Sequence, residues 1–255
     1  MPERSVLVPV ASLSVLGAFL LTWELLPPAL GVPQDIIPPA SDLWFEMAPM
    51  WCFENLPAHI LTTGSMALRG FVLGDAGGHA LGLLPAWERV LSPYILASQI
   101  APKVAFAPLL IMWFGFNAWP EQIVTILIVF FPILVNVLPS MRLADWDLVS
   151  QARAYSMSKD QVLGKVPFTP SMPNLMAGLR SGATLAVIGI TVGEVVGSQI
   201  GLGYLITYGQ SPANTAMIFN SIILLTLIAT ALQAAVAAVT AVEARVLHRI
   251  PRSLH

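Results

Sequence analysis

Charged residues are scarce in this sequence. Lysine, arginine, aspartate and glutamate together make up 10% of the 255 residues, whereas a soluble globular chain carries about 25%. So few charges cannot cover the surface of a soluble domain, and a hydrophobic content of 56% excludes a disordered chain. The composition therefore predicts a polytopic membrane protein.

Cysteine and an excess of positive charge are also missing. The single cysteine, Cys52, excludes an intramolecular disulfide and a multi-cysteine metal site. A net charge of -2 leaves no broad basic face for nucleic acid. The sequence has no Gly-x4-Gly-Lys-Ser/Thr phosphate-binding pattern, so we expect no ATP hydrolysis by this chain. We therefore expect no enzyme activity, no metal, no cofactor bound by the chain and no nucleic-acid partner.

Six apolar stretches are long enough to cross the hydrocarbon core of a membrane, which takes about 20 helical residues. The first is interpreted as a retained span rather than a signal peptide, because no small-residue cleavage site and soluble domain follow it. The predicted spans are residues 6–26, 59–84, 93–114, 121–141, 175–196 and 213–246. We therefore expect one all-α transmembrane domain over residues 1–255.

The distribution of basic residues predicts the orientation. With the N-terminus in the cytoplasm, the predicted outer loops (about 27–58, 115–120 and 197–212) contain no lysine or arginine. Positive charge gathers on the cytoplasmic side of membrane proteins. This asymmetry predicts six spans with both termini cytoplasmic. The predicted inner segments hold Arg4, Arg89, Arg142, Arg153, Lys159, Lys165, Arg245, Arg249 and Arg252.

Glycines recur at four-residue spacing in two predicted spans. Residues 59–84 contain Gly70, Gly74 and Gly78, and residues 175–196 lead into a second series. Glycines on one helix face let another backbone approach closely. Two interpretations stay open, packing within the chain and packing between two copies. We assign the second series, Gly189, Gly193 and Gly197, to packing in a dimer.

Polar side chains inside the predicted spans are candidates for a translocation pathway. Charges at membrane depth are costly and usually face protein or water. Asp75 and His79 lie four residues apart and share a helix face. Three roles stay open for this pair: a hydrogen-bonded helix lock, a pathway lining or a proton site. The candidate set is Arg69, Asp75, His79, Asn136 and Glu194.

The most polar stretch, residues 145–173, lies between the fourth and fifth predicted spans. Asp145 or Asp147 caps a first short helix, and Ser158 with Gln161 forms a capping box for a second. We expect prolines 167, 170 and 173 to stop any helix before the fifth span. The pattern predicts a cytoplasmic helical hairpin that serves as a docking surface.

Several motifs resemble one known family. Gln151-Ala-Arg-Ala-Tyr-Ser-Met-Ser, followed by Ala177-Gly-Leu-Arg180, is similar to the "EAA" loop of binding-protein-dependent ABC importer permeases. Gly193-Glu-Val-Val-Gly197 and Gly201-Leu-Gly-Tyr-Leu-Ile206 resemble the branch for nitrate, sulfonate, taurine, bicarbonate, thiamine precursors and aromatic acids. The resemblance covers about residues 38–248. The loop departs from the family where Ser150 replaces Glu and Ser156 replaces Gly.

The resemblance implies a permease that works with other subunits in the bacterial inner membrane. These are a second permease copy, two ATPase subunits that hold ATP and Mg, and a periplasmic or lipid-anchored substrate-binding protein. Glu194 matches an acidic position of the family. Two roles stay open for its side chain, a substrate contact and a structural partner. The implied ATPase-coupling residues are Ser150, Gln151, Ala152, Arg153, Ala154, Tyr155, Ser156, Met157 and Ser158.

Two other classes of membrane protein remain as alternatives. An ion-coupled secondary transporter accounts for Asp75, His79 and Glu194, but not for the predicted hairpin, and no inverted repeat is evident. A membrane-embedded hydrolase needs a nucleophile and a base, and no serine or cysteine is obviously placed beside His79. The sequence does not specify the transported solute.

Overall fold

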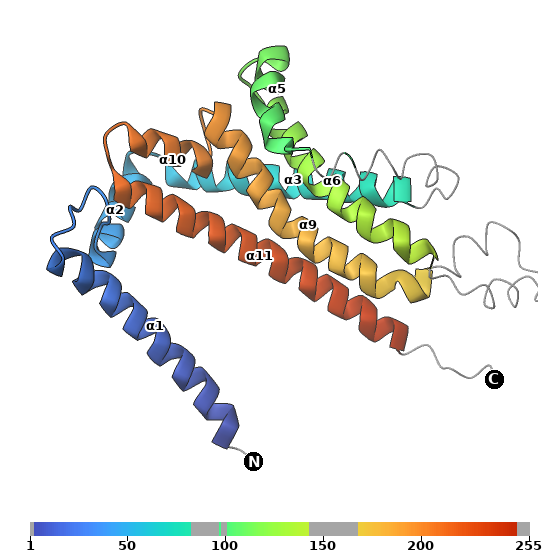
Figure 1. Ribbon diagram of the computed structural model, residues 1–255, viewed down its shortest axis with the longest axis horizontal. Coiled ribbons are helices and arrows are strands. Elements are labelled where there is room, and N and C mark those ends of the chain that lie inside the picture. The colour runs from blue at the N-terminus through green and yellow to red at the C-terminus, as the bar shows by residue number, and fades with distance from the viewer. Residues whose placement is uncertain (1–2, 83–96, 98–100, 143–167, 249–255) are drawn as a thin grey trace, which may run out of the picture.

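The computed structural model describes residues 3–82, 97, 101–142 and 168–248, and this part of the chain is helical without strands. The helices form an elongated bundle (Figure 1). Their bounds are α1 Glu3–Ala29, α2 Ala40–Cys52, α3 Leu56–Gly82, η1 Lys103–Phe106, α5 Ala107–Phe114, α6 Ala118–Arg142, α9 Phe168–Gly197, α10 Leu202–Gln210 and α11 Thr215–His248.

Helix α6 packs against both α3 and α9, which also contact each other. Glycines remove side-chain bulk at both contacts. On the α3 side, a Cβ atom at Gly74 would lie 2.8 Å from Val129 Cβ, and one at Gly78 would lie 2.9 Å from Ile133 Cγ2. On the α9 side, a Cβ at Gly189 would lie 2.9 Å from Thr125 Cα. The three helices therefore pack at distances that only glycine allows.

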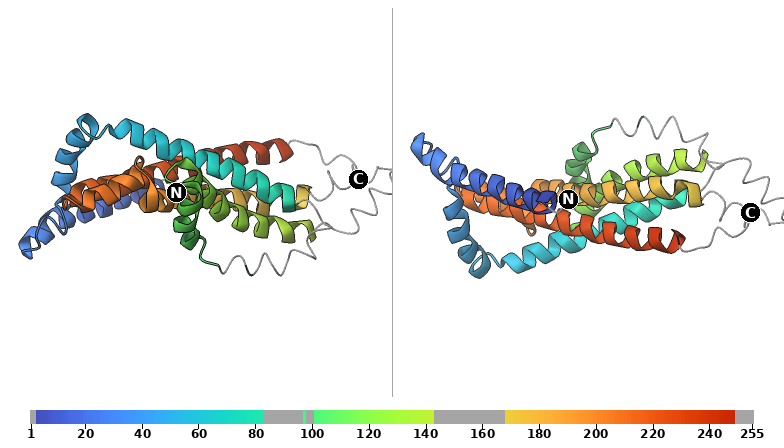
Figure 2. Two further views of the ribbon diagram at one scale, coloured as in Figure 1. Left: turned by 90° about the horizontal axis from the view of Figure 1, so that it is seen from above. Right: turned by 90° about the horizontal axis from the view of Figure 1, so that it is seen from below.

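These contacts also fix the helix directions. Along α3, Gly70, Gly74 and Gly78 meet successively later residues of α6, so the two helices run parallel. Along α9, Gly189 meets Thr125 whereas Gly193 meets Glu121, so α9 runs antiparallel to α6. Helix α11 packs along α9, and Figure 2 shows these long helices running side by side.

Four of the described helices are long and apolar enough to cross a membrane. They lie within α1, α6, α9 and α11, and η1 with α5 forms a shorter apolar unit, Lys103–Phe114. Helix α3 matches the second predicted span in position, but it carries Arg69 and Asp75 and is less apolar. The all-α membrane fold is confirmed, and the number of six spans is approximate.

The structure differs from the sequence prediction in three helices. Helix α9 begins at Phe168, so Pro170 and Pro173 lie in its first two turns instead of ending a helix. Proline is tolerated at Pro170 because the first four N–H groups of a helix have no intrahelical partner. Pro173, the sixth residue of α9, lies beyond these groups. Helices α2 and α10 lie in segments that we predicted as outer loops.

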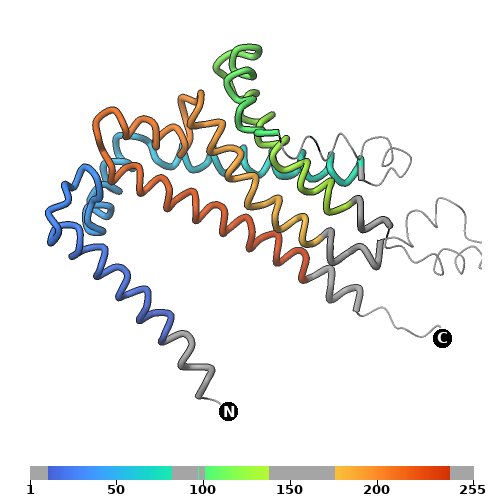
Figure 3. Tube along the Cα trace, in the orientation of Figure 1, coloured from blue at the N-terminus to red at the C-terminus, as the bar shows by residue number. Residues whose placement is uncertain are grey.

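Helix α1 stands apart from the bundle (Figure 3). Only 6% of its membrane-length segment, Ala11–Ala29, is buried within the chain. Its C-terminal end is tethered to the start of α2. Trp23 donates to the Pro38 carbonyl (3.0 Å), and Glu24 accepts hydrogen bonds from the Ser41 amide (2.9 Å) and hydroxyl (2.8 Å). The rest of α1 is left for lipid or another protein.

Candidate functional site

A buried polar cluster joins α3, α9 and α10. Glu194 of α9 has no exposed surface, and its carboxylate accepts hydrogen bonds from the Thr63 hydroxyl (2.7 Å) and the Gly203 amide (2.8 Å). The Thr63 oxygen accepts from the Leu202 amide (2.8 Å), and His59 Nδ1 accepts from the Gly201 amide (2.9 Å). We call these side chains and the start of α10 the Glu194 cluster.

The Glu194 cluster caps the first turn of α10. The N-terminal amides of a helix have no partner within the helix and carry partial positive charge. Here Leu202 and Gly203 donate to side chains from α3 and α9, since Gly201 itself supplies no side-chain cap. A carboxylate at a helix N-terminus is favourable, above all where water is excluded. Glu194 and Thr63 therefore fix α10 to the preceding helix, α9, and to α3, which is distant in sequence.

Two glycines make room for the Glu194 carboxylate. A Cβ atom at Gly201 would overlap the carboxylate, and one at Gly203 would lie 2.7 Å from Glu194 Cβ. Gly201 also has φ of +121°, a conformation that favours glycine. The Gly-Leu-Gly sequence at 201–203 thus permits the close approach. The His59 ring also stacks on the Tyr204 ring of α10, with ring centroids 5.9 Å apart.

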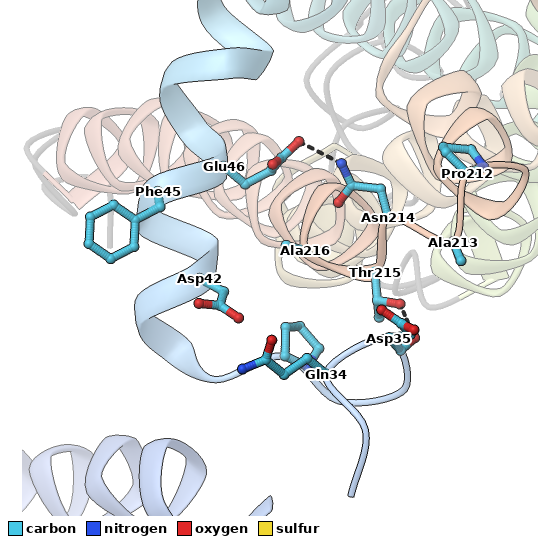
Figure 4. Close-up of a pocket in the computed structure, with 11 residues that line it drawn as sticks. Gln34, Asp35, Asp42, Phe45, Glu46, Pro212, Ala213, Asn214, Thr215 and Ala216 are labelled. Carbon is cyan, nitrogen blue, oxygen red and sulfur yellow. Dashed lines mark hydrogen bonds between the residues drawn. The ribbon is translucent and has the colours of Figure 1, made fainter. Parts of the chain in front are cut away.

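A pocket of about 510 Å³ opens between the α1–α2 loop, α2 and the start of α11 (Figure 4). Glu46 accepts a hydrogen bond from Asn214 (2.6 Å), and the Asp35 carbonyl accepts one from Thr215. Asp42 also lines the pocket, so three acidic residues surround it. It lies at the end of the bundle that holds α2 and α10, which we call the α2–α10 end.

The other pathway candidates do not gather in one place. His79 Nδ1 donates to the Asp75 carbonyl (3.0 Å) and lies 3.0 Å from Asp75 Oδ1, and both side chains are about one-quarter exposed. Asn136 donates back to the Pro132 carbonyl of its own helix (2.8 Å). Glu194 is enclosed in its cluster, whereas Arg69 is exposed on α3. Their role in a pathway stays a prediction.

The glycines that we assigned to a dimer interface contact the same chain. A Cβ at Gly193 would lie 2.8 Å from Glu121 Cα, and one at Gly197 would overlap Ile111. Together with the Gly189–Thr125 contact, these positions place the glycine face of α9 against α6 and α5. Within the described part of the chain these three glycines serve packing between helices of one copy, and their role in a dimer stays a prediction.

The predicted ATPase-coupling residues, 150–158, lie outside the described residues. Within the described part of the chain, no group of three or more histidine, cysteine, aspartate or glutamate side chains is placed to hold a metal ion. Sequence reasoning missed His59 and Thr63 of the Glu194 cluster. Their four-residue spacing at the start of α3 was a detectable signal, but their partners lie more than 130 residues away.

Comparison with known proteins identifies the family. The family described as the binding-protein-dependent transport system inner membrane component matches residues 70–248. The chain belongs to this family. It is the permease component of an ABC transporter, and not an enzyme of that system. Glu194 and the start of α10 lie inside the matched region, whereas α1 and α2 precede it.

Curated relatives cover most of the permease. The riboflavin transport system permease protein RibX of Chloroflexus aurantiacus is 34% identical over 82% of this chain and 80% of its own length. The formylaminopyrimidine transport permease protein ThiX of Halalkalibacterium halodurans is 30% identical over 78% and 82%. The taurine transport system permease protein TauC of Escherichia coli is 27% identical over 82% and 75%. The three relatives are named for three different solutes.

Proposed function

We propose that two copies of this permease form the translocation pathway of an ABC importer. The solute is a small polar or anionic molecule delivered by an extracytoplasmic binding protein. Two ATPase subunits, each holding ATP and Mg, bind the cytoplasmic segment 145–173. Family membership is the observation that carries this proposal, because the family is defined as the membrane component of binding-protein-dependent transport systems.

The two ends of the bundle support the proposed orientation. The pocket at the α2–α10 end has Asp35, Asp42 and Glu46 on its walls and no lysine or arginine. In the sequence, basic residues concentrate instead in residues 142–165 and 245–252, which begin at the last residue of α6 and in the last turn of α11. Because basic residues favour the cytoplasmic side, the α2–α10 end faces outward and receives the binding protein. Both termini are then cytoplasmic in a multi-pass inner-membrane protein.

A two-fold pair is proposed because one chain offers too few helices to surround a pathway. Two copies related by a two-fold axis use the same surface twice and enclose a pathway on that axis. The glycine faces of α3 and α9 are occupied within the chain. The pair therefore meets through other surfaces, which include the free side of α1.

Purification tests the proposed function directly. When the tagged permease is expressed with its neighbouring ATPase and binding-protein genes, we expect the ATPase subunit to co-elute in detergent. Reconstituted complexes should take up solute only with ATP, and vanadate should stop the uptake. Uptake that runs on an ion gradient without a co-eluting ATPase would instead favour a secondary transporter. Proteoliposomes prepared in the same way but without the permease are the control.

A charge reversal at Arg153 tests the coupling segment. We expect Arg153→Glu to leave the permease in the membrane but to lower ATP-driven uptake at least tenfold, because the ATPase contact is lost. The ratio of solute transported to ATP hydrolysed reports this change. Arg249→Glu, near the C-terminus and outside the segment, is the matched control. A second variant, Ala152→Trp, adds bulk to the same segment. Normal uptake by both Arg153→Glu and Ala152→Trp would contradict the assignment.

A further inference from the structure

We propose that Arg69 on α3 is the position in the translocation pathway that attracts an oxyanion group of the solute. The inference rests on the proposed function, since it assumes that the permease encloses a pathway. It assigns a specific residue of this chain to the attraction of the anionic solute.

Arg69 belongs to a continuous exposed face of α3. The opposite face carries Gly70, Gly74 and Gly78 and is covered by α6. Exposed residues recur at helical spacing and therefore form one stripe along the helix. Ser65 lies one turn from Arg69 on this stripe. The exposed stripe consists of Leu61, Ser65, Leu68, Arg69, Val72, Leu73, Ala76 and Ala80.

Arg69 lies at membrane depth. It is the fourteenth of the 27 residues of α3, so about 20 Å of helix extends on either side. Its neighbour Gly70 packs on Thr125, which lies seven residues, or about 10 Å, inside the start of α6. A guanidinium at this depth is costly in hydrocarbon. The exposed stripe of α3 therefore faces water or protein.

Arg69 has no partner in the described part of the chain. Two other basic side chains are described, and each has an interaction. Lys103 lies 5.2 Å from the centre of the Phe131 ring, and Arg180 donates to the Thr240 hydroxyl (3.5 Å). No hydrogen bond or ion pair involves Arg69 among the described residues. Among the described residues, the positive charge of Arg69 is thus left without a neutralising group.

A second copy does not supply the missing negative charge from its described residues. At membrane depth, Asp75 lies beside His79, and Glu121 and Glu194 are buried against α9 and α10. Glu3 lies at the start of α1 and Glu243 in the last two turns of α11, and the remaining carboxylates of the described residues lie at the α2–α10 end: Glu24, Asp35, Asp42, Glu46 and Glu54. A two-fold pair would bring two arginines to the pathway, whereas Asp75, Glu121 and Glu194 each have contacts within their own chain. An oxyanion group of a solute in the pathway would bind Arg69, because the planar guanidinium binds such groups through paired hydrogen bonds.

Thiol labelling tests the inference in the complete transporter. In a Cys52→Ser background, Ser65→Cys places a thiol one turn from Arg69. Spheroplasts are treated with sulfonatoethyl methanethiosulfonate, an anion, or with its trimethylammonium analogue, a cation. We expect the anion-to-cation rate ratio to exceed the ratio at exposed Cys52 in the unmodified protein. Arg69→Gln should lower the ratio at position 65 about tenfold, and Arg69→Lys should keep it.

Two results would overturn the inference. Absence of reaction with either reagent would mean that lipid or a second copy covers the stripe. A ratio at position 65 equal to that at Cys52 would mean that Arg69 attracts no anion, and this comparison decides the matter even if Arg69→Gln does not assemble. Co-elution of the ATPase is measured in parallel. If the ATPase co-elutes and the labelling fails, this inference alone fails, whereas loss of co-elution counts against the proposed function.

Discussion

Thr63→Val should destabilise the permease and reduce uptake more than tenfold. Valine matches threonine in shape but lacks the hydroxyl that joins Glu194 to the Leu202 amide. Two buried groups then lose a hydrogen bond, and each such loss costs about 1–3 kcal/mol. At about 2–4 °C per kcal/mol, the midpoint of thermal unfolding should fall by at least ~5 °C in detergent. Fluorescence-detected unfolding and uptake by proteoliposomes measure the two effects.

Thr63→Ser is the matched control for this prediction. Serine keeps the hydroxyl and removes one buried methyl group, which costs about 1 kcal/mol. Uptake by Thr63→Ser should stay within about twofold of the unmodified permease, since 1 kcal/mol of stability leaves most molecules folded. If Thr63→Val unfolds at the same temperature as Thr63→Ser, the hydroxyl does not hold α10 in place.

Gly193→Ala should disrupt the contact between α6 and α9. The added Cβ would lie 2.8 Å from Glu121 Cα and 2.9 Å from its Cβ, so backbone as well as side chain must move. Overpacking of this kind costs about 1–3 kcal/mol, which corresponds to roughly 2–12 °C in the unfolding midpoint. We expect a broadened profile in size-exclusion chromatography and a lower yield of folded permease, and Gly193→Leu should have a larger effect.

Gly64→Ala provides the comparison, because a Cβ at Gly64 would have no atom within 4 Å. Its unfolding midpoint should match that of the unmodified permease. The Gly193 variants also separate two roles of the glycine stripe. Loss of the folded permease indicates packing within the chain. A normal midpoint combined with dissociation of a permease pair would instead assign Gly193 to an interface between copies.

The long helices were predictable because their signal is local. Apolar runs gave α6 and α11 to within about three residues at each end. The start of α9 was misplaced because Pro170 and Pro173 were expected to break a helix, although proline fits a first turn. Helices α2 and α10 are too short to cross a membrane, so a search for spans left them as loops.

The Glu194 cluster was only partly predictable from the sequence. A glutamate inside an apolar span marks a position that needs a partner, and Glu194 was selected for this reason. Its partners, Thr63 and the amides of α10, are ordinary residues until the fold brings them together. The glycine stripes likewise indicated close packing, but spacing alone does not tell whether the opposing helix belongs to the same chain.

The packing of α6 against both α3 and α9 has a consequence for how the protein is made. Its two faces are covered by a helix synthesised before it, α3, and by one synthesised after it, α9. A nascent chain that stops before residue 168 has α3 and α6 but lacks the glycine face that covers Glu121 and Thr125. It then presents a glutamate to lipid or to the insertion machinery, which is unfavourable. Unfinished permeases therefore differ chemically from finished ones, at a position that membrane quality control can recognise.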